Sequence, residues 1–115
     1  MSSMMTFEPF DIVEVPFPFI DAPVRKVRPA LVLSFPEFNR SNAAIILAMV
    51  TSTGRASWHH DVALEAWQEA GLRKPSIVRW KVFTLETALV LGKRGHLAQQ
   101  DQKAVRHALR NVFGL

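Results

Sequence analysis

The chain has 115 residues and a mass of 13.0 kDa, which is the size of one ordinary domain. Hydrophobic residues make up 49% and charged residues 21%, a composition typical of a globular rather than a disordered chain. Cysteine is absent, which excludes disulfides, thiolate metal sites and cysteine nucleophiles and agrees with a reducing compartment. The net charge of +4 and the pI of about 10.1 are typical of a domain that binds polyanions, although many basic proteins bind none.

The charges are unevenly distributed along the chain. Residues 1–21 contain four acidic residues and no Lys or Arg, whereas residues 72–115 contain nine basic residues and two acidic ones. Few aromatic residues lie among these bases, which argues against a base-stacking surface of alternating basic and aromatic residues. A surface for a polyanion and an ordinary solvated surface both remain open.

No segment has the length of a membrane span. The longest unbroken apolar run, residues 43–50, is less than half of the ~20 residues that a spanning helix needs. Residues 1–7 lack the basic and apolar regions of a signal peptide. We therefore expect a cytoplasmic protein with no membrane partner, made of a flexible tail over residues 1–6 and a single domain over residues 7–115.

The N-terminal half contains three predicted strands. Residues 11–15 form a short β-like run, which ends where prolines interrupt strand pairing and a long loop begins. Residues 28–34 are the second strand, and residues 35–42 are predicted to be a loop. Residues 44–50 are apolar throughout, which is typical of a strand buried on both faces. Since a second covering layer is hard to find within so short a chain, we suspect that a partner subunit supplies it.

The C-terminal half predicts a short strand, one or two helical turns, two further strands and a terminal helix. These elements cover residues 61–64, 65–70, 76–84, 87–91 and 99–112. The last segment repeats apolar residues at spacings of three and four, which indicates a helix with one buried face. Short strands, turns rich in proline and glycine, and one helix predict a mainly β fold, a small and strongly bent antiparallel barrel with a C-terminal helix.

Arg28 is the most informative single residue. It stands at the start of an apolar strand, and Pro29 restricts its backbone. A guanidinium fixed at that position matches the oxygens of a phosphate, which favours an anion-binding role. A solvated arginine at a strand end is the alternative.

Three hydroxyl residues, Thr51, Ser52 and Thr53, follow the apolar strand. They could donate to a phosphate or orient a ribose hydroxyl, or they could bind their own backbone in a turn. Arg25, Lys26 and Arg55 lie in the loops beside Arg28 and Thr51. If those loops meet, four cations converge on one groove; if they do not, the charges are scattered and solvated.

His59 and His60 precede Asp61, and a histidine beside a carboxylate is a possible general acid or base. Exposed histidines in a hairpin are the alternative. Their spacing fits no metal motif, and no glycine-rich nucleotide loop or hydrolase elbow occurs. We therefore expect neither a metal nor a cofactor.

The motifs of this chain, taken in order, resemble those of the MazF/PemK toxins. The resemblance covers roughly residues 7–115 and is carried by Asp11-Ile12-Val13, Val15-Pro16-Phe17-Pro18-Phe19, Arg28-Pro29-Ala30-Leu31-Val32-Leu33-Ser34 and Thr51-Ser52. A later stretch is similar to one branch of the family, with Ala70-Gly71-Leu72, Lys74-Pro75-Ser76-Ile77-Val78-Arg79, Phe83-Thr84-Leu85 and Leu91-Gly92.

The resemblance implies an SH3-like small barrel of the MazF/PemK/CcdB toxin type with a C-terminal helix, assembled as a homodimer. It implies the toxin of a type II toxin–antitoxin system, a growth inhibitor that cuts single-stranded mRNA at short sequences without a metal. Arg28 and Thr51 fall on the family's catalytic positions. We expect Arg25, Lys26, Ser52, Arg55 and Arg79 to bind RNA. The implied partners are single-stranded RNA and an acidic antitoxin, with possible DNA binding by the complex.

Two features depart from the family pattern. Phe10 stands where the family usually has a glycine, and a required positive φ there would move the start of the first strand. No acid occurs shortly before Arg28, where some members carry one, so a carboxylate base is missing from that loop. A non-catalytic nucleic-acid-binding or gyrase-poisoning toxin of the same fold, or a decayed inactive toxin, is the alternative function.

Cleavage of RNA without a metal requires a base for the ribose 2′-hydroxyl and stabilisation of the phosphorane charge. Arg28 and Thr51 can stabilise the charge, but neither has a pKa suited to a general base near neutrality. The base is therefore unassigned, with His59 or His60 as candidates. By the resemblance, the expected products are a 2′,3′-cyclic phosphate and a 5′-hydroxyl.

Overall fold

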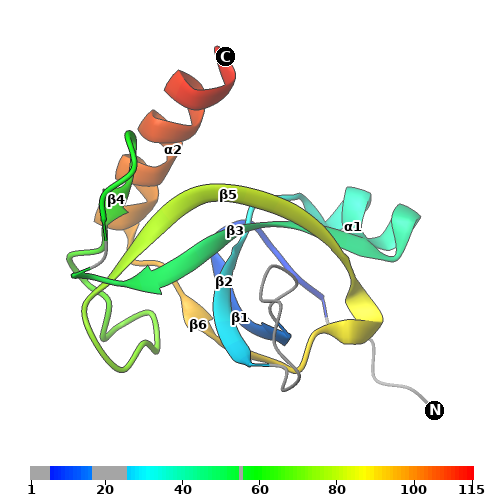
Figure 1. Cartoon of the computed structure of the whole chain (residues 1–115). Helices are drawn as coiled ribbons and strands as arrows, with labels where there is room; N and C mark the ends of the chain where they lie inside the picture. The colour runs from blue at the N-terminus through cyan, green and yellow to red at the C-terminus, as the bar shows by residue number, and fades with distance from the viewer. Residues whose placement is uncertain (1–5, 17–25, 55) are drawn as a thin grey trace.

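The computed structural model describes residues 6–16, 26–54 and 56–115 (Figure 1). Within these residues, strands of one antiparallel sheet alternate with two α-helices and one short 3-10 helix. In chain order they are β1 (Asp11–Pro16), β2 (Val27–Val32), α1 (Pro36–Asn42), β3 (Ala44–Ser52), β4 (Val62–Ala63), β5 (Ser76–Glu86), η1 (Thr87–Leu89), β6 (Gly92–His96) and α2 (Gln99–Phe113).

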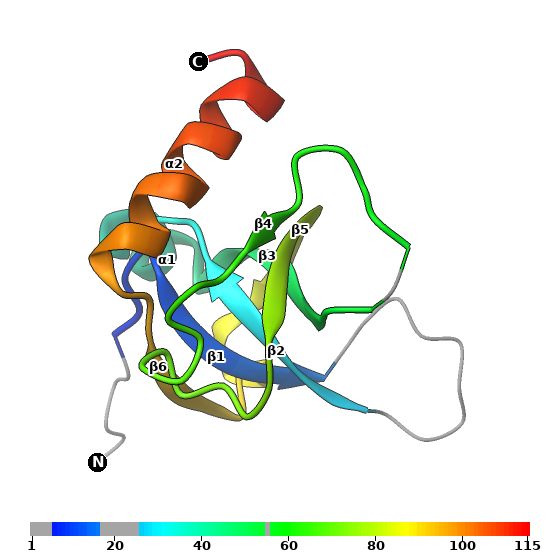
Figure 2. The same ribbon diagram turned by 90° about the vertical axis from the view of Figure 1, so that its left-hand side faces the viewer.

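The described strands form one curled sheet in the order β4-β5-β3-β2-β1-β6. Long β3 and β5 arch over β1 and β2, and α2 projects from one end of the sheet (Figures 1 and 2). The predicted mainly β fold, a bent antiparallel sheet with a C-terminal helix, is confirmed. The predicted tail falls largely on residues 1–5, outside the described residues, and the single domain over residues 7–115 stays a prediction.

Two apolar clusters lie on opposite faces of β3. Ile45 and Leu47 pack in one cluster with side chains of β1 and β2, whereas Ala48 and Val50 belong to a second cluster that includes Val105 of α2. The two clusters follow the alternation of side chains along the strand, and a register shift against β5 lies between Ala48 and Met49. The second covering layer that we sought in a partner subunit therefore lies within the chain, so burial of this strand does not require a dimer.

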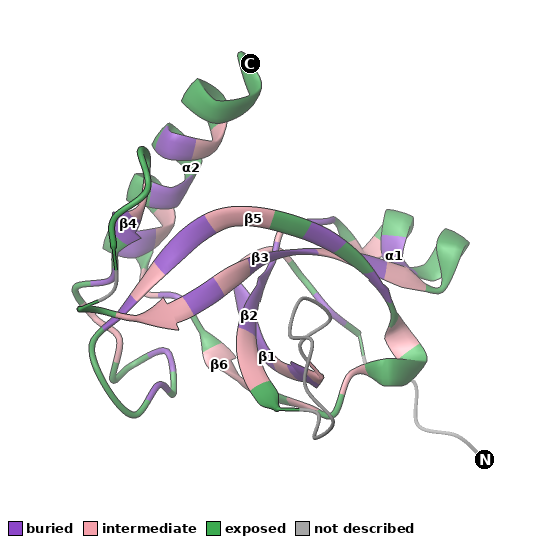
Figure 3. Cartoon of the chain, viewed as in Figure 1, coloured by how far each residue is buried: buried purple, intermediate pink, exposed green. Residues whose placement is uncertain are grey.

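Helix α2 packs on the sheet through its N-terminal half. Asp101, Val105 and Ala108 are its buried residues, and its C-terminal end is exposed (Figure 3). The Asp101 carboxylate accepts the backbone N–H groups of Glu65 and Ala66, both at 2.9 Å. Residues 65–70 form hydrogen-bonded turns, and the Ala70 N–H donates to the Ala66 carbonyl at 3.3 Å, as in one turn of an α-helix. No helix in the described part of the chain is long and apolar enough to cross a membrane.

The prediction of a loop over residues 35–42 is wrong, because α1 occupies Pro36–Asn42. Pro36 starts the helix, where its missing N–H costs nothing. Buried Asn39 donates to the backbone oxygens of Phe7 at 3.1 Å and Ser34 at 3.2 Å. These tertiary hydrogen bonds stabilise a helix in a polar segment, and no local sequence pattern predicts them.

The prediction of a strand over residues 87–91 is also wrong. The segment begins with the short helix η1, whose Thr87 N–H is bound by the carbonyl of Ala43 at 3.0 Å. The strand follows later, as β6, in a sequence of glycine and charged residues with no β-branched side chain. It forms because β1 offers a free edge with which it pairs from Asp11 to Glu14.

Phe10 adopts a positive φ of 76°, the conformation that glycine favours. Its N–H donates to the Val32 carbonyl at 2.8 Å, and its own carbonyl accepts the Leu97 N–H at 3.0 Å. The first strand still begins at Asp11. The expected displacement of the strand start does not occur, because the surrounding hydrogen bonds hold the phenylalanine in the strained conformation.

Candidate active site

A cavity of about 180 Å³ brings Arg28 and Thr51 together. It lies where β1, β2, β3, β5 and β6 meet the loop between Gly71 and Ser76. Its lining residues are Glu14, Val27, Arg28, Pro29, Val50, Thr51, Ser52, Leu72, Arg73, Lys74, Ser76 and Arg94. The polar character of these residues makes this cavity the candidate active site, which we call the basic pocket.

Both predicted catalytic residues are placed by paired strands. Arg28 is the second residue of β2 and pairs with Val15 of β1. Thr51 and Ser52 are the last residues of β3 and pair with β5. Arg28 and the two hydroxyl residues are all partly buried. Side chains on hydrogen-bonded strands move little, so the arrangement is organised before a substrate arrives.

Among the described residues that line the pocket are four cations, Arg28, Arg73, Lys74 and Arg94, and one carboxylate, Glu14. Arg94 Nη2 lies 2.9 Å from Glu14 Oε2. Guanidinium groups and hydroxyls that line one pocket suit the oxygens of a phosphodiester. The arrangement can therefore hold a phosphate and stabilise negative charge that develops on it.

Sequence reasoning missed Glu14, Arg73, Lys74 and Arg94 as pocket residues. The basic excess over residues 72–115 includes the last three, but that count does not say which bases converge. The backbone of this loop is held at Lys74, whose carbonyl accepts the hydroxyl of buried Ser76 at 2.8 Å.

Two glycines bring Arg94 to the pocket. Gly71 has a φ of 82°, and a Cβ at that position would collide with the backbone of Arg94. A Cβ on Gly95 would overlap the carbonyl of Ala70. The turn at Ala70–Gly71 and the strand at Arg94–Gly95 therefore approach each other closely, which only glycine permits at these two positions.

Three predicted RNA-binding residues cannot be assigned to this pocket. Arg25 and Arg55 lie outside the described residues, as does most of the loop before β2. Lys26 is exposed beside β2 but is not among the described residues that line the pocket. Ser52 is the member of the predicted RNA-binding set that the pocket does include.

Arg79 does not lie in the basic pocket. Its side chain is 8% exposed, and its Nη2 lies 2.8 Å from Asp61 Oδ2 and 2.6 Å from the carbonyl of Ala56. Its guanidinium carbon also lies 5.4 Å from the centre of the Trp58 ring. This environment gives no support to the expected RNA contact and instead makes Arg79 a structural residue that anchors the segment before β4.

His59 and His60 are exposed and lie outside the pocket lining. The His60 carbonyl accepts the indole N–H of Trp80 at 2.7 Å. The carboxylate expected to assist a histidine, Asp61, is bound to Arg79 instead. The structure therefore does not bring either histidine to Arg28, and their acid–base role gains no support.

A different histidine contacts a carboxylate. His96 Nδ1 lies 2.8 Å from Oδ1 of buried Asp11, and Lys93 Nζ lies 3.2 Å from Oδ2 of the same residue. These groups tie β6 to β1 outside the basic pocket. Among residues 6–16, 26–54 and 56–115, no cluster of three or more metal-ligating side chains occurs.

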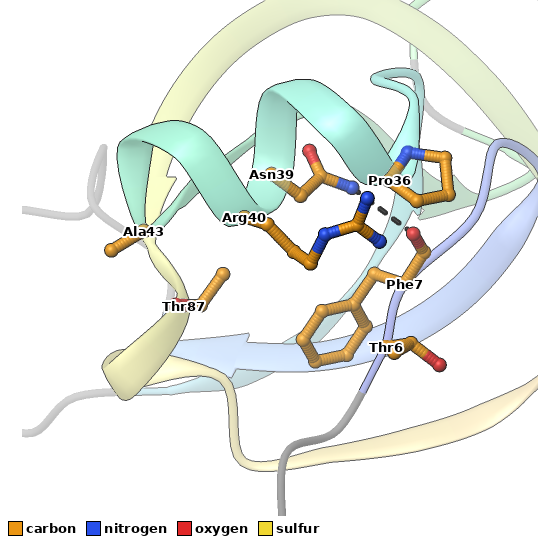
Figure 4. Close-up of a pocket in the computed structure, with 7 residues that line it drawn as sticks. All are labelled: Thr6, Phe7, Pro36, Asn39, Arg40, Ala43 and Thr87. Atoms are coloured by element: carbon orange, nitrogen blue, oxygen red, sulfur yellow. Dashed lines mark hydrogen bonds between the residues drawn. The ribbon is translucent and has the colours of Figure 1, made fainter.

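A second cavity, of about 190 Å³, lies between α1 and the segment before β1 (Figure 4). Its walls are mainly apolar, with Phe7 facing Arg40 of α1 (Figure 4). One charged side chain, Arg40, stands among the described residues that line it. This cavity lacks the converging donors that an active site needs, so the basic pocket is the stronger candidate.

The sequence matches the family described as PemK-like, MazF-like toxins of type II toxin–antitoxin systems over residues 8–113. No curated protein matches significantly. Solved structures do match, including an endoribonuclease in complex with its cognate antitoxin from a mycobacterial species, at 17% identity, a TM-score of 0.76 and 97% coverage of both chains.

Two further structures show the same fold. The Mycobacterium tuberculosis toxin MazF-mt6 is 25% identical with a TM-score of 0.69, and the alignment covers 91% of this chain and 97% of that one. A MazE–MazF structure from Deinococcus radiodurans is 20% identical with a TM-score of 0.74, over 97% and 99% of the two chains.

Proposed function

Since the chain belongs to the family of PemK-like and MazF-like toxins of type II toxin–antitoxin systems, we propose that it is an endoribonuclease that cleaves single-stranded mRNA without a metal ion. The observation that carries the proposal is the convergence of Arg28 and Thr51 in one pocket with three further cations. Structures that resemble this one include proteins named as endoribonucleases.

In the proposed reaction the ribose 2′-oxygen attacks the adjacent phosphorus. The 2′-oxygen–phosphorus bond forms, the bond from phosphorus to the 5′-oxygen breaks, and the 2′-hydroxyl proton leaves to a base. The 5′-oxygen takes a proton from water, which gives a 2′,3′-cyclic phosphate and a 5′-hydroxyl. Arg28 presents its guanidinium to the charge that develops on phosphorus, and Thr51 donates a hydrogen bond to a phosphate oxygen.

The proposed partners follow from the family. We expect an acidic antitoxin with a segment that folds on binding to the basic pocket and blocks it. Related structures contain a cognate antitoxin or MazE. Exposed apolar side chains at the end of α2, Val112, Phe113 and Leu115, offer surface for the antitoxin or for a homodimer. We also propose that the chain inhibits growth, that it is located in the cytoplasm, and that its complex with the antitoxin binds DNA.

The test is cleavage of end-labelled single-stranded RNA by the purified chain in EDTA, with cyclic-phosphate ends as the readout. An all-deoxy oligonucleotide of the same sequence should stay intact. Arg28→Ala should lower cleavage by about 10²–10³-fold, and Arg28→Lys should restore little of it because a point charge lacks the guanidinium fork. Arg110→Ala, on an exposed position of α2, is the matched control.

Full activity of Arg28→Lys would contradict the proposed role of Arg28. Intact RNA together with stalled gyrase would favour the gyrase-poisoning alternative. Intact RNA that is nevertheless bound would favour a non-catalytic nucleic-acid-binding or inactive toxin.

A further inference from the structure

Glu14 is the one carboxylate among the described residues that line the basic pocket. It lies on β1 and pairs with Pro29 of β2, the residue after Arg28, and both Glu14 and Arg28 line the pocket. Its side chain is 37% exposed, although the neighbouring Val13 and Val15 are fully buried. The carboxylate therefore reaches the pocket from a rigid strand.

Arg94 orients this carboxylate. Its Nη2 binds Glu14 Oε2 at 2.9 Å, and the Arg94 side chain is only 18% exposed. The backbone of Glu14 is held as well, because its carbonyl accepts the Leu91 N–H at 2.8 Å. Among the described residues no hydrogen bond to Glu14 Oε1 is formed, so one carboxylate oxygen is available to accept a proton.

Among the described residues that line the pocket, the groups other than Glu14 are not proton acceptors suited to this task. Arg28 comes from β2, Arg73 and Lys74 from the loop before β5, and Arg94 from β6, and all four are cations. The remaining polar side chains among the described lining residues are the hydroxyls of Thr51, Ser52 and Ser76. Neither an arginine nor a hydroxyl is an effective base near neutral pH. Among the described lining residues, the Glu14 carboxylate is therefore the group suited to accept a proton.

A carboxylate in a pocket that binds a phosphodiester is unfavourable for substrate binding. It repels the anionic substrate and neutralises part of the charge of Arg94, which weakens substrate binding. A side chain that only bound RNA would not need this negative charge. A base that accepts the 2′-hydroxyl proton does need it.

We infer that Glu14 is the general base of the RNA cleavage reaction, an inference that rests on the proposed function. The Glu14 carboxylate takes the proton of the 2′-hydroxyl as the 2′-oxygen bonds to phosphorus. The bond to the 5′-oxygen then breaks, and the 5′-oxygen takes a proton from water. Glu14 afterwards releases its proton to solvent, and Arg94 is the positioning residue that aims the carboxylate.

The test compares Glu14→Gln with the wild-type chain in steady-state cleavage of single-stranded RNA from pH 5 to 9. We expect kcat to fall by about 10²–10⁴-fold while KM stays the same or falls, because the repulsive charge is gone. Glu86→Gln, an exposed acid at the end of β5 outside the pocket, should leave kcat, KM and the pH–rate profile unchanged.

Glu14→Ala provides a second measurement that does not depend on the glutamine variant folding. Added formate should restore part of its activity, since a small carboxylate can enter the space left by the side chain and accept the proton. A purely structural partner of Arg94 would not produce recovery that depends on the basic form of the additive.

The outcomes separate the two proposals. If the wild-type chain cleaves RNA but Glu14→Gln stays within about threefold of its kcat, or if folded Glu14→Ala shows no recovery with formate, the base assignment is overturned and the nuclease proposal stands. If the wild-type chain does not cleave RNA, both proposals fall.

Discussion

Arg79 and Asp61 form a two-point ion pair, with Nη2 at 2.8 Å from Oδ2 and Nε at 3.2 Å from Oδ1. Their side chains are 8% and 12% exposed. The same carboxylate accepts the Trp58 N–H at 2.9 Å. The pair therefore joins the middle of β5 to the segment before β4 and keeps that segment beside the sheet.

Removal of the Asp61 charge should destabilise the fold without changing the chemistry of the basic pocket. Asp61→Asn leaves Arg79 buried without its counter-ion, and we expect a loss of about 2–4 kcal/mol in the free energy of unfolding. Denaturant unfolding measures the loss. Glu69→Gln, which changes an exposed acid in the turn between β4 and β5, should stay within about 0.5 kcal/mol of wild type. A comparable loss in RNA cleavage per folded molecule would instead show that Arg79 serves the substrate.

The same ion pair predicts how the stability of the fold depends on pH. Burial favours the neutral Asp61 carboxyl, but hydrogen bonds from Arg79 and the Trp58 N–H, with the charge of Arg79, outweigh this effect and lower its pKa. Because the folded-state pKa lies below the unfolded one, the stabilisation is complete above about pH 4 and is lost as the pH falls further. The stability difference between wild type and Asp61→Asn should shrink between pH 5 and pH 2. A difference that stays constant over this range would contradict the pKa shift.

The close approach of the Ala70–Gly71 turn to β6 should make Gly95 intolerant of substitution. Gly95→Ala would drive a methyl group into the Ala70 carbonyl, and we expect a loss of about 1–3 kcal/mol in the free energy of unfolding. It should also lower RNA cleavage, because Arg94 precedes Gly95. Gly92→Ala is the matched control, since a Cβ there meets nothing within 4 Å. Equal stability of the two variants would show that the approach is looser than the structure indicates.

Phe10 has a strained backbone, and its side chain packs against the core. Its ring lies 4.8 Å from the guanidinium carbon of Arg106 and packs against the core cluster that contains Ile12. Phe10→Gly and Phe10→Ala both lose the ring, but only alanine keeps the penalty of a positive φ. We expect Phe10→Gly to be the more stable of the two by about 1 kcal/mol, measured by thermal unfolding. The opposite order would show that the backbone relaxes at this position.

Patterns in the sequence were sufficient to predict the elements whose structure follows from local composition. Apolar β-branched runs predicted β1, β3 and β5, and spacings of three and four predicted α2. The family motif led directly to Arg28 and Thr51, which the fold brings into one pocket. These features depend on residues close together in the chain.

The contacts that sequence reasoning missed depend on residues far apart. Glu14 and Arg94 are 80 positions apart, and they meet only because β6 pairs with β1 despite a composition that does not favour a strand. Helix α1 depends in the same way on Asn39, which reaches the carbonyl of Phe7 across 32 positions. Such pairings can be identified only from the folded sheet, not from local sequence patterns.

The hydroxyl of Thr51 gives the most direct test of the pocket besides Arg28. Thr51→Val keeps the β-branched shape that suits the end of β3 but removes the donor, so kcat should fall by about 10²-fold with little change in melting temperature. Thr51→Ser keeps the donor and should retain most of the activity. Thr53→Val, one position beyond the strand and outside the pocket lining, should cleave RNA as the wild type does. Unchanged cleavage by Thr51→Val would remove the hydroxyl from the mechanism and leave Arg28 as the proposed source of charge stabilisation.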